Sequence, residues 1–322
     1  MPQTSITLHF EGRQVIALPR GSFANQVLWS SPARAVGDGI YTVENTDPAL
    51  DDLDDLARRS GISLLRSDRP FIGSAAQQLA NALHGGWLHE VHNLHRNDEP
   101  HWALETVWDC GPLNAALTDS PINSVAVIHH PVSEMEFMVA EHPTTHDLLV
   151  GPKTPTIECP SVRFLASQVP TPRGIRASSV ADAVKQLTPV IPAFDRALCE
   201  GRMKLIAADL TKTTTGTTAT DEALSNFYLE QGPRLARRVL AAGTLLTSPE
   251  ENDLLHRVGR GSWPIDRDVT AAWRVDAHRL IGLARATGLG LPQSPAPAPA
   301  PPTRPLPPTL PKPPGRSTGG LR

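Results

Sequence analysis

Residues 5–18, SITLHFEGRQVIAL, decide how the fold begins. Apolar side chains alternate with polar ones at Ile6, Leu8 and Phe10, and the alternation resumes at Ile16 and Leu18 after a Glu-Gly pair. A period of two interrupted by glycine is typical of two antiparallel strands joined by a short turn. The chain is therefore expected to open with a β-hairpin.

The following segments extend this hairpin to an α+β domain over residues 1–150. Strand-like patterns occur at 40–44 and 62–66, and helix signals occur at 47–60 and 74–84. Alternating segments then predict two further hairpins, so we expect a meander of four strands with flanking helices. The strands of these two hairpins are residues 87–94 with 101–108, and 124–130 with 134–140.

Beyond this domain, three further parts are expected. Residues 151–178 are rich in proline and read as a connector, in which only 161–169 could form a strand. Residues 179–290 form a mostly helical region, and 291–322 contain twelve prolines and no acidic residue, which predicts a disordered tail. The helices are expected at 179–187, 192–210, 221–242, 249–258 and 266–286. Whether the helical region is a domain of its own or a layer on the sheet stays open.

Composition narrows the classes of function. The chain has 322 residues and a formal charge of -3, whereas proteins whose main partner is nucleic acid or an anionic membrane usually carry a basic excess. Three widely spaced cysteines and the absence of a signal-like or 18-residue apolar stretch favour a cytoplasmic protein with free thiols. The preference for arginine over lysine is typical of a GC-rich bacterial genome.

A histidine-rich segment is the first candidate site. Nine of the twelve histidines lie between residues 84 and 146, and histidine is the commonest metal ligand. If residues 87–94 and 101–108 pair, His89 or His92 could face His101 and bind zinc for metal-assisted hydrolysis. On a strand, however, His89 and His92 point to opposite faces, and no known metal motif is present. Half-buried sheet histidines are the simpler interpretation, and no cofactor is expected.

A cysteine gives the second candidate site. Cys110 precedes a possible short helix at 112–117, where a thiol can have a lowered pKa. His129 or His130, followed by Asp147, would complete a Cys-His-Asp order for thiol catalysis. No sequence signature surrounds Cys110, so a packed thiol is the simpler interpretation.

Other patterns point to no chemistry. Arg234, Arg237 and Arg238 could bind phosphate or an acidic partner, but a solvated helix face is the simpler interpretation. Phosphate-binding glycine loops and the serine-hydrolase elbow are absent. No motif assigns the chain to a family.

The sequence thus favours a non-enzymatic cytoplasmic binding or accessory protein. It would engage a protein partner through its folded part and use the proline-rich tail as a tether or docking segment. The alternatives are a histidine-centred metal-dependent hydrolase and a Cys110-based thiol enzyme. Nothing in the sequence indicates the oligomeric state.

Overall fold

We analysed a computed structural model of the chain. The predicted tail lies outside the residues that it describes, and so do Cys110 and most of the predicted connector. The described residues are 4–37, 39–94, 100–108, 111–119, 122–154, 169, 173–212, 223–243, 248–261 and 269–290.

The first sheet contains the predicted N-terminal hairpin. Its order is β3-β4-β2-β1-β5, and β1 pairs antiparallel with β2 around Gly12, whose φ of 61° suits the tight turn. At the edge β5 pairs parallel with β1, which departs from the purely antiparallel prediction. The strands are β1 (Ser5–Glu11), β2 (Gln14–Arg20), β3 (Arg34–Gly37), β4 (Ile40–Glu44) and β5 (Ser63–Ser67).

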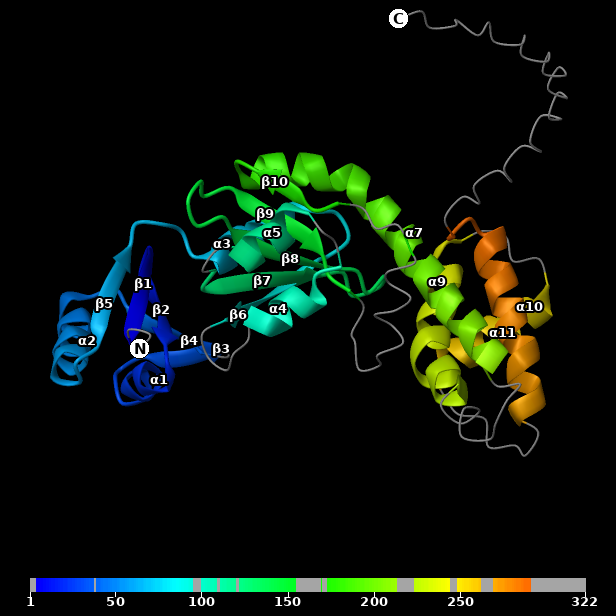
Figure 1. Ribbon diagram of the computed structural model, residues 1–322, viewed down its shortest axis with the longest axis horizontal. Helices are drawn as coiled ribbons and strands as arrows, with labels where there is room; N and C mark the ends of the chain where they lie inside the picture. The colour runs from blue at the N-terminus through cyan, green and yellow to red at the C-terminus, as the bar shows by residue number, and fades with distance from the viewer. Residues whose placement is uncertain are drawn as a thin grey trace, which may run out of the picture. The chain divides into compact units, whose positions relative to one another are not determined.

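Two helices cover one face of this sheet (Figure 1). Helices α1 (Ser22–Trp29) and α2 (Asp47–Arg59) pack on the alternate residues of β1 that point to their side, Ile6 and Leu8. Ile16 and Leu18 of β2 belong instead to the core shared with the second sheet. Both faces of the hairpin are therefore buried in part, and its register is fixed by both cores.

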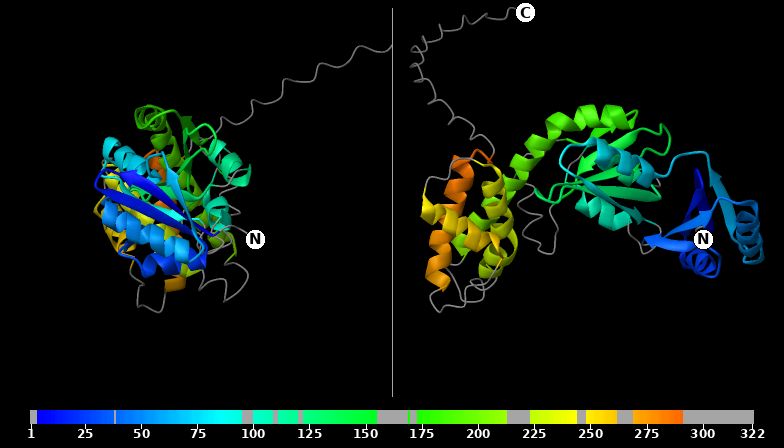
Figure 2. Two further views of the ribbon diagram at one scale, coloured as in Figure 1. Left: turned by 90° about the vertical axis from the view of Figure 1, so that its left-hand side faces the viewer. Right: turned by 180° about the vertical axis from the view of Figure 1, so that it is seen from behind.

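The second sheet is an antiparallel meander in the order β10-β9-β8-β7-β6, and it lies between two helical layers (Figure 2). Helix α3 (Ile72–Ala82) and the first half of α7 (Val180–Lys212) cover one face. Helices α4 (Pro100–Thr106) and α5 (Pro112–Asp119) cover the other. The strands are β6 (Leu88–Asn93), β7 (Ser124–His129), β8 (Glu136–Glu141), β9 (Leu148–Pro152) and β10 (Ile175–Ala177).

The predicted hairpin of residues 87–94 with 101–108 is wrong in its second half. The chain forms α4 there, because Pro100 can occupy a first helical position and the apolar residues Ala103 and Val107 are spaced for a helix face. Both pack with Leu113 of α5. The partner of β6 is β7, and β9 and β10 complete the sheet.

The helical region begins within α7. This 33-residue helix continues through Pro189 and Pro192, where the sequence predicted a break. Its Leu187 and Phe194 pack on the second sheet, and its Cys199 belongs to the core of the helical region. Among the described residues, the helical elements that follow include η1, a π-helix (Asn226–Gln231), α9 (Gly232–Ala241), α10 (Pro249–Gly259) and α11 (Val269–Ala286).

The observed order, sheets with flanking helices followed by helices, confirms the predicted α+β class. The limits of the predicted domains stay predictions, since α7 contributes to both the sheet layer and the helical core.

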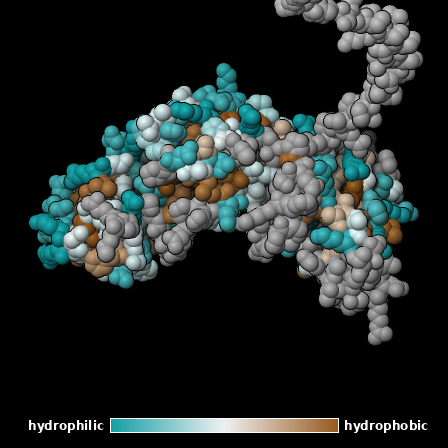
Figure 3. Space-filling model, in the orientation of Figure 1, coloured by the Kyte–Doolittle hydropathy of each residue, from teal (hydrophilic) through white to brown (hydrophobic). Residues whose placement is uncertain are grey.

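Among the described residues, no helix has the length and apolar character needed to cross a membrane. Hydrophobic side chains gather over β7 and β8 in the view of Figure 3.

Candidate functional site: a cleft between the two sheets

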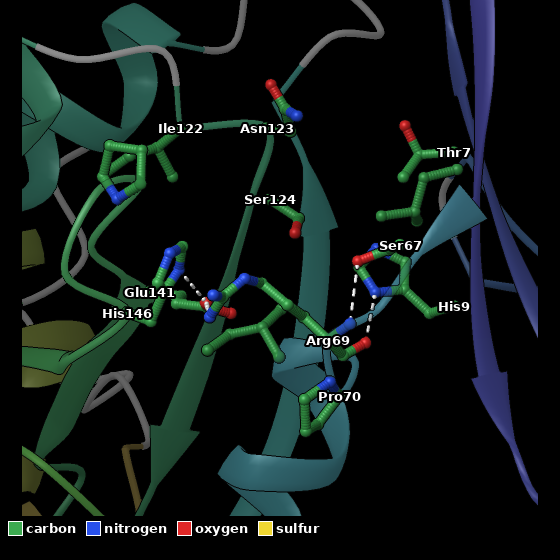
Figure 4. Close-up of a pocket in the computed structure, with 13 residues that line it drawn as sticks. Thr7, His9, Ser67, Arg69, Pro70, Ile122, Asn123, Ser124, Glu141 and His146 are labelled. Atoms are coloured by element: carbon green, nitrogen blue, oxygen red, sulfur yellow. Dashed lines mark hydrogen bonds and ion pairs between the residues drawn. The ribbon is translucent and has the colours of Figure 1, made fainter. Parts of the chain in front are cut away.

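A cleft of about 230 Å³ lies where the ends of β1 and β5 approach the second sheet (Figure 4). Its polar lining comes from Thr7 and His9 of β1, Ser67 of β5, and Ser124 and Glu141 of the second sheet. The apolar walls include Leu18 of β2, Ile72 of α3 and Ile122, which precedes β7. The cleft thus combines an apolar floor with polar groups that converge on it, as ligand sites commonly do.

Arg69 crosses this cleft, as Figure 4 shows. Its Nη1 donates to Oε1 of Glu141 at 2.8 Å, and the same carboxylate oxygen lies 2.8 Å from Nδ1 of His146. The two hydrogen bonds fix the guanidinium and the imidazole in place. Arg69 keeps about a third of its side chain exposed, and its Nε lies 3.8 Å from Oδ1 of the exposed Asp68.

The segment after β5 is bound to β1 by side chains. Nδ1 of His9 lies 3.1 Å from the carbonyl oxygen of Arg69, and Oε1 of Glu11 accepts the backbone N–H of Phe71 at 2.7 Å. Oγ of Ser67 accepts the backbone N–H of Arg69 at 3.2 Å. Hydrogen bonds therefore fix both the backbone and the guanidinium of Arg69.

The other wall of the cleft is a tight turn between β8 and β9. His146 has a φ of 65°, a left-handed conformation that histidine adopts more readily than most residues. Its backbone N–H donates to the carbonyl oxygen of His142 at 2.9 Å, and the backbone N–H of His142 donates to the carbonyl oxygen of Asp147 at 2.9 Å. These bonds keep a strained residue in place, and such residues tend to occur at binding sites.

Asp147, a predicted catalytic residue, binds this turn to β10. Its carboxylate accepts hydrogen bonds from Arg176 and from Thr145, which hold its pKa below the ordinary value. His130, its predicted partner, follows β7 at the other end of the sheet. The six-residue strand β8, about 17 Å long, lies between the positions of the two residues. The structure does not bring His130 and Asp147 together, and Cys110 lies outside the described residues.

His130 itself is packed against Trp87, with ring centroids 5.2 Å apart. Its Nδ1 accepts the backbone N–H of Ser133 at 3.1 Å. Burial and the positive charge of Arg238 lower its pKa, although Asp195 and a bond to the backbone of Gly85 oppose them. These contacts favour a neutral imidazole with a structural role.

The predicted metal ligands lack the hairpin that would have assembled them. His89 is exposed on β6, and His92 is half-buried with its ring 4.7 Å from that of Trp102 and Nε2 3.1 Å from Glu90. Their opposite faces on β6 agree with the expected strand geometry. His101 lies on α4. In the part of the chain that the structure describes, no three potential ligands are placed to share a metal ion.

The cleft residues were not predicted from the sequence. Arg69 and Glu141 are 72 positions apart, and neither lies in a motif. The only local signal is that Ser67 and Glu141 each end a strand, where polar side chains often serve function. The chain matches no protein-family model, no curated protein and no solved structure.

Proposed function

We propose that this chain is a non-enzymatic cytoplasmic binding protein whose cleft receives the acidic chain end of a protein partner. The observation that carries the proposal is the partly exposed side chain of Arg69, whose guanidinium is fixed by Glu141 within a cleft lined by hydroxyl and imidazole groups. A fixed guanidinium is well suited to bind a carboxylate through two parallel hydrogen bonds. In this proposal the proline-rich tail, residues 291–322, is a tether or docking segment.

The size of the cleft favours a short segment. A volume of about 230 Å³ is below the range of roughly 300–1,000 Å³ that is usual for pockets of drug-sized ligands. One or two residues of an extended chain would occupy it. A chain end supplies such a segment together with a carboxylate.

The neighbouring edge strand offers a place for the rest of the partner segment. β5 ends the order of the first sheet, so among the described strands nothing pairs with its outer side. Leu65 and Ser67 point to the same face as Thr7 and His9, and Leu65 is about half exposed. A partner strand that runs parallel to β5 would bring its carboxyl end to Ser67 and Arg69.

The proposal is tested by selecting peptides that have free carboxyl ends for binding to the full chain. The selected peptides are then measured by fluorescence anisotropy as acids and as amides, with Arg69→Ala beside the wild type. We expect amidation and Arg69→Ala each to weaken binding by roughly tenfold or more. Arg66→Ala is the matched control, since Arg66 lies on the adjoining strand β5 but sits over Phe10, on the face opposite to Leu65 and Ser67. Peptides that bind equally well as amides, or to Arg69→Ala, would refute the proposal.

The other predicted functions have no added support. The metal-dependent hydrolase and the Cys110 thiol enzyme both need side chains that the described residues do not bring together. Both stay alternatives that metal analysis and thiol labelling can test.

A further inference from the structure

Three arginines surround one carboxylate on the side of the second sheet next to the helical region. Oε2 of Glu134 lies 3.5 Å from Nη2 of Arg202 and 3.0 Å from Nε of Arg234. Oε1 of the same residue accepts from Nη2 of Arg237 at 2.8 Å. One negative charge thus faces three positive ones, which leaves an excess of two.

Arg202 is the buried member of this group. Only 2% of its side chain is exposed, and its contact with Glu134 is at the long limit of a hydrogen bond. Its Nε has no hydrogen-bond partner in the described structure. A buried donor without a partner is costly, and nearly all buried donors in native proteins bind a protein group or an ordered water. Burial also lowers the pKa of Arg202, although the charges of Glu134 and Asp195 oppose the shift.

The next ion pair supplies only part of the missing charge, since Asp195 opposes the lowered pKa of Arg202 but is shared with Arg238. Arg238 donates from Nε to both carboxylate oxygens of Asp195, at 2.8 and 3.0 Å, so this carboxylate is already engaged. The positive charge of Arg238 also reaches His130, whose pKa it helps to lower. The surroundings of Arg202 therefore favour a further anion.

The group is also open and ordered on its outer side. Arg237 is about half exposed, and its Nη1 donates to the carbonyl oxygen of Gly259 at 3.2 Å, which fixes the guanidinium plane. Arg234 is about a quarter exposed. A ligand can therefore approach from solvent toward the buried Arg202.

We propose that Arg202, Arg234 and Arg237 form a binding site for the phosphoryl group of a small molecule. A phosphoryl group carries close to two negative charges near neutral pH and several acceptor oxygens, which matches the excess charge and the planar arginine forks. Glu134 is the resident carboxylate that holds the three side chains together. Because it repels the incoming anion, its removal should tighten binding.

The test uses the full chain, with inorganic phosphate and free phosphoserine as probes, followed by ³¹P NMR at constant ionic strength. We expect saturable binding in the wild type, about tenfold weaker binding in the Arg234→Ala, Arg237→Ala double variant, and about threefold tighter binding in Glu134→Gln. Tighter binding of phosphoserine than of phosphate would identify a phosphate monoester as the ligand class. Tighter binding of phosphate than of phosphoserine would identify a free anion.

Arg58→Ala is the control for loss of one exposed arginine, because Arg58 pairs with Asp54 and Asp55 on α2. Its affinity should equal that of the wild type. Equal affinity in all variants, or no saturable binding in wild type and Glu134→Gln, would overturn the proposal. The test relies on Arg234 and Arg237, which are partly exposed, and circular dichroism confirms that each variant is folded.

Discussion

Glu134 and Arg237, 103 positions apart in the chain, are joined by a hydrogen bond of 2.8 Å from Nη2 to Oε1. Glu134 has a φ of 55° in the turn after β7, and its backbone N–H donates to the carbonyl oxygen of His130 at 2.8 Å. The turn thereby presents its carboxylate to α9. Together with α7, this contact connects the second sheet to the helical region.

The first prediction concerns the stability that Glu134 provides. In Glu134→Gln the three arginines lose their shared carboxylate, and Arg202 is buried without compensation, so the free energy of unfolding should fall by about 1–3 kcal/mol. Urea denaturation at pH 7 measures this change. Glu44→Gln, at an exposed position that ends β4, should change the value by no more than about 0.5 kcal/mol. If Glu134→Gln lowers the free energy of unfolding no more than Glu44→Gln does, the arginine contacts do not stabilise the fold.

The second prediction contrasts two helical glycines. A Cβ at Gly73 of α3 would lie 2.5 Å from Cε1 of Phe71 and 2.9 Å from Cγ2 of Val91, whereas one at Gly282 of α11 would have no atom within 4 Å. Gly73→Ala should therefore destabilise the protein by about 1–3 kcal/mol through overpacking. Gly282→Ala should stabilise it by about 0.4–1 kcal/mol, because the unfolded chain loses freedom. Thermal and urea unfolding of the two variants test the contrast, and the same sign for both would contradict the packing around α3.

The third prediction concerns pH. The pKa of His130 is lowered in the folded state, mainly by burial, from an ordinary value of 6.5. As the pH falls below this value, the unfolded state binds a proton before the native state does. The stabilising contribution is therefore complete above pH 6.5 and is lost as the pH falls through the folded pKa.

The free energy of unfolding is measured for wild type and His130→Gln between about pH 5 and 8. The difference in this free energy between the two proteins should shrink as the pH falls. Both proteins share the other histidines, so the contributions of these residues to the pH dependence cancel in the comparison. NMR titration of the imidazole supplies the folded pKa directly. A midpoint at or above 6.5 would contradict the burial and the charge contacts described for His130.

The elements that the sequence predicted correctly have strong local signals. The hairpin of residues 5–18 has alternating apolar residues and a glycine turn, and the helix from Pro249 follows Ser248, whose Oγ accepts the backbone N–H of Glu251 at 3.1 Å. β9 was missed because its residues are all buried and end in Gly-Pro, so no alternation appears. Residues 101–108 have apolar residues that fit either period, and Pro100 together with packing against α5 favours the helix.

The candidate sites could not be predicted because they depend on contacts between distant segments. Arg234 and Arg237 are helix residues that local reasoning assigns to a solvated face, and only the turn at Glu134 shows that they are engaged. Likewise, the segment of Arg69 is bound to β1 by contacts across 60 positions. Sequence spacing describes one element at a time, whereas both sites combine two or more.

The final prediction concerns Cys199, the cysteine that the described structure places in the helical core. Burial, with a smaller contribution from Asp195, raises its pKa to about 12 from an ordinary value of 9.0. The thiol should therefore stay protonated and unreactive at pH 8, because the thiolate is the nucleophile and reagents do not reach it. Its contribution to stability is complete below pH 9 and is lost as the pH rises toward 12.

Pulse alkylation followed by peptide mass spectrometry measures this reactivity. The peptide that contains Cys199 should remain unmodified in native protein at pH 8 and become modified when urea is added, at a rate that follows global unfolding. Glu134→Gln should accelerate the modification, because Cys199 and Arg202 lie one turn apart on α7 and the weakened ion pairs lower the cost of opening. Rapid native-state labelling of Cys199 in the wild type would mean that the helical core opens without unfolding the sheet.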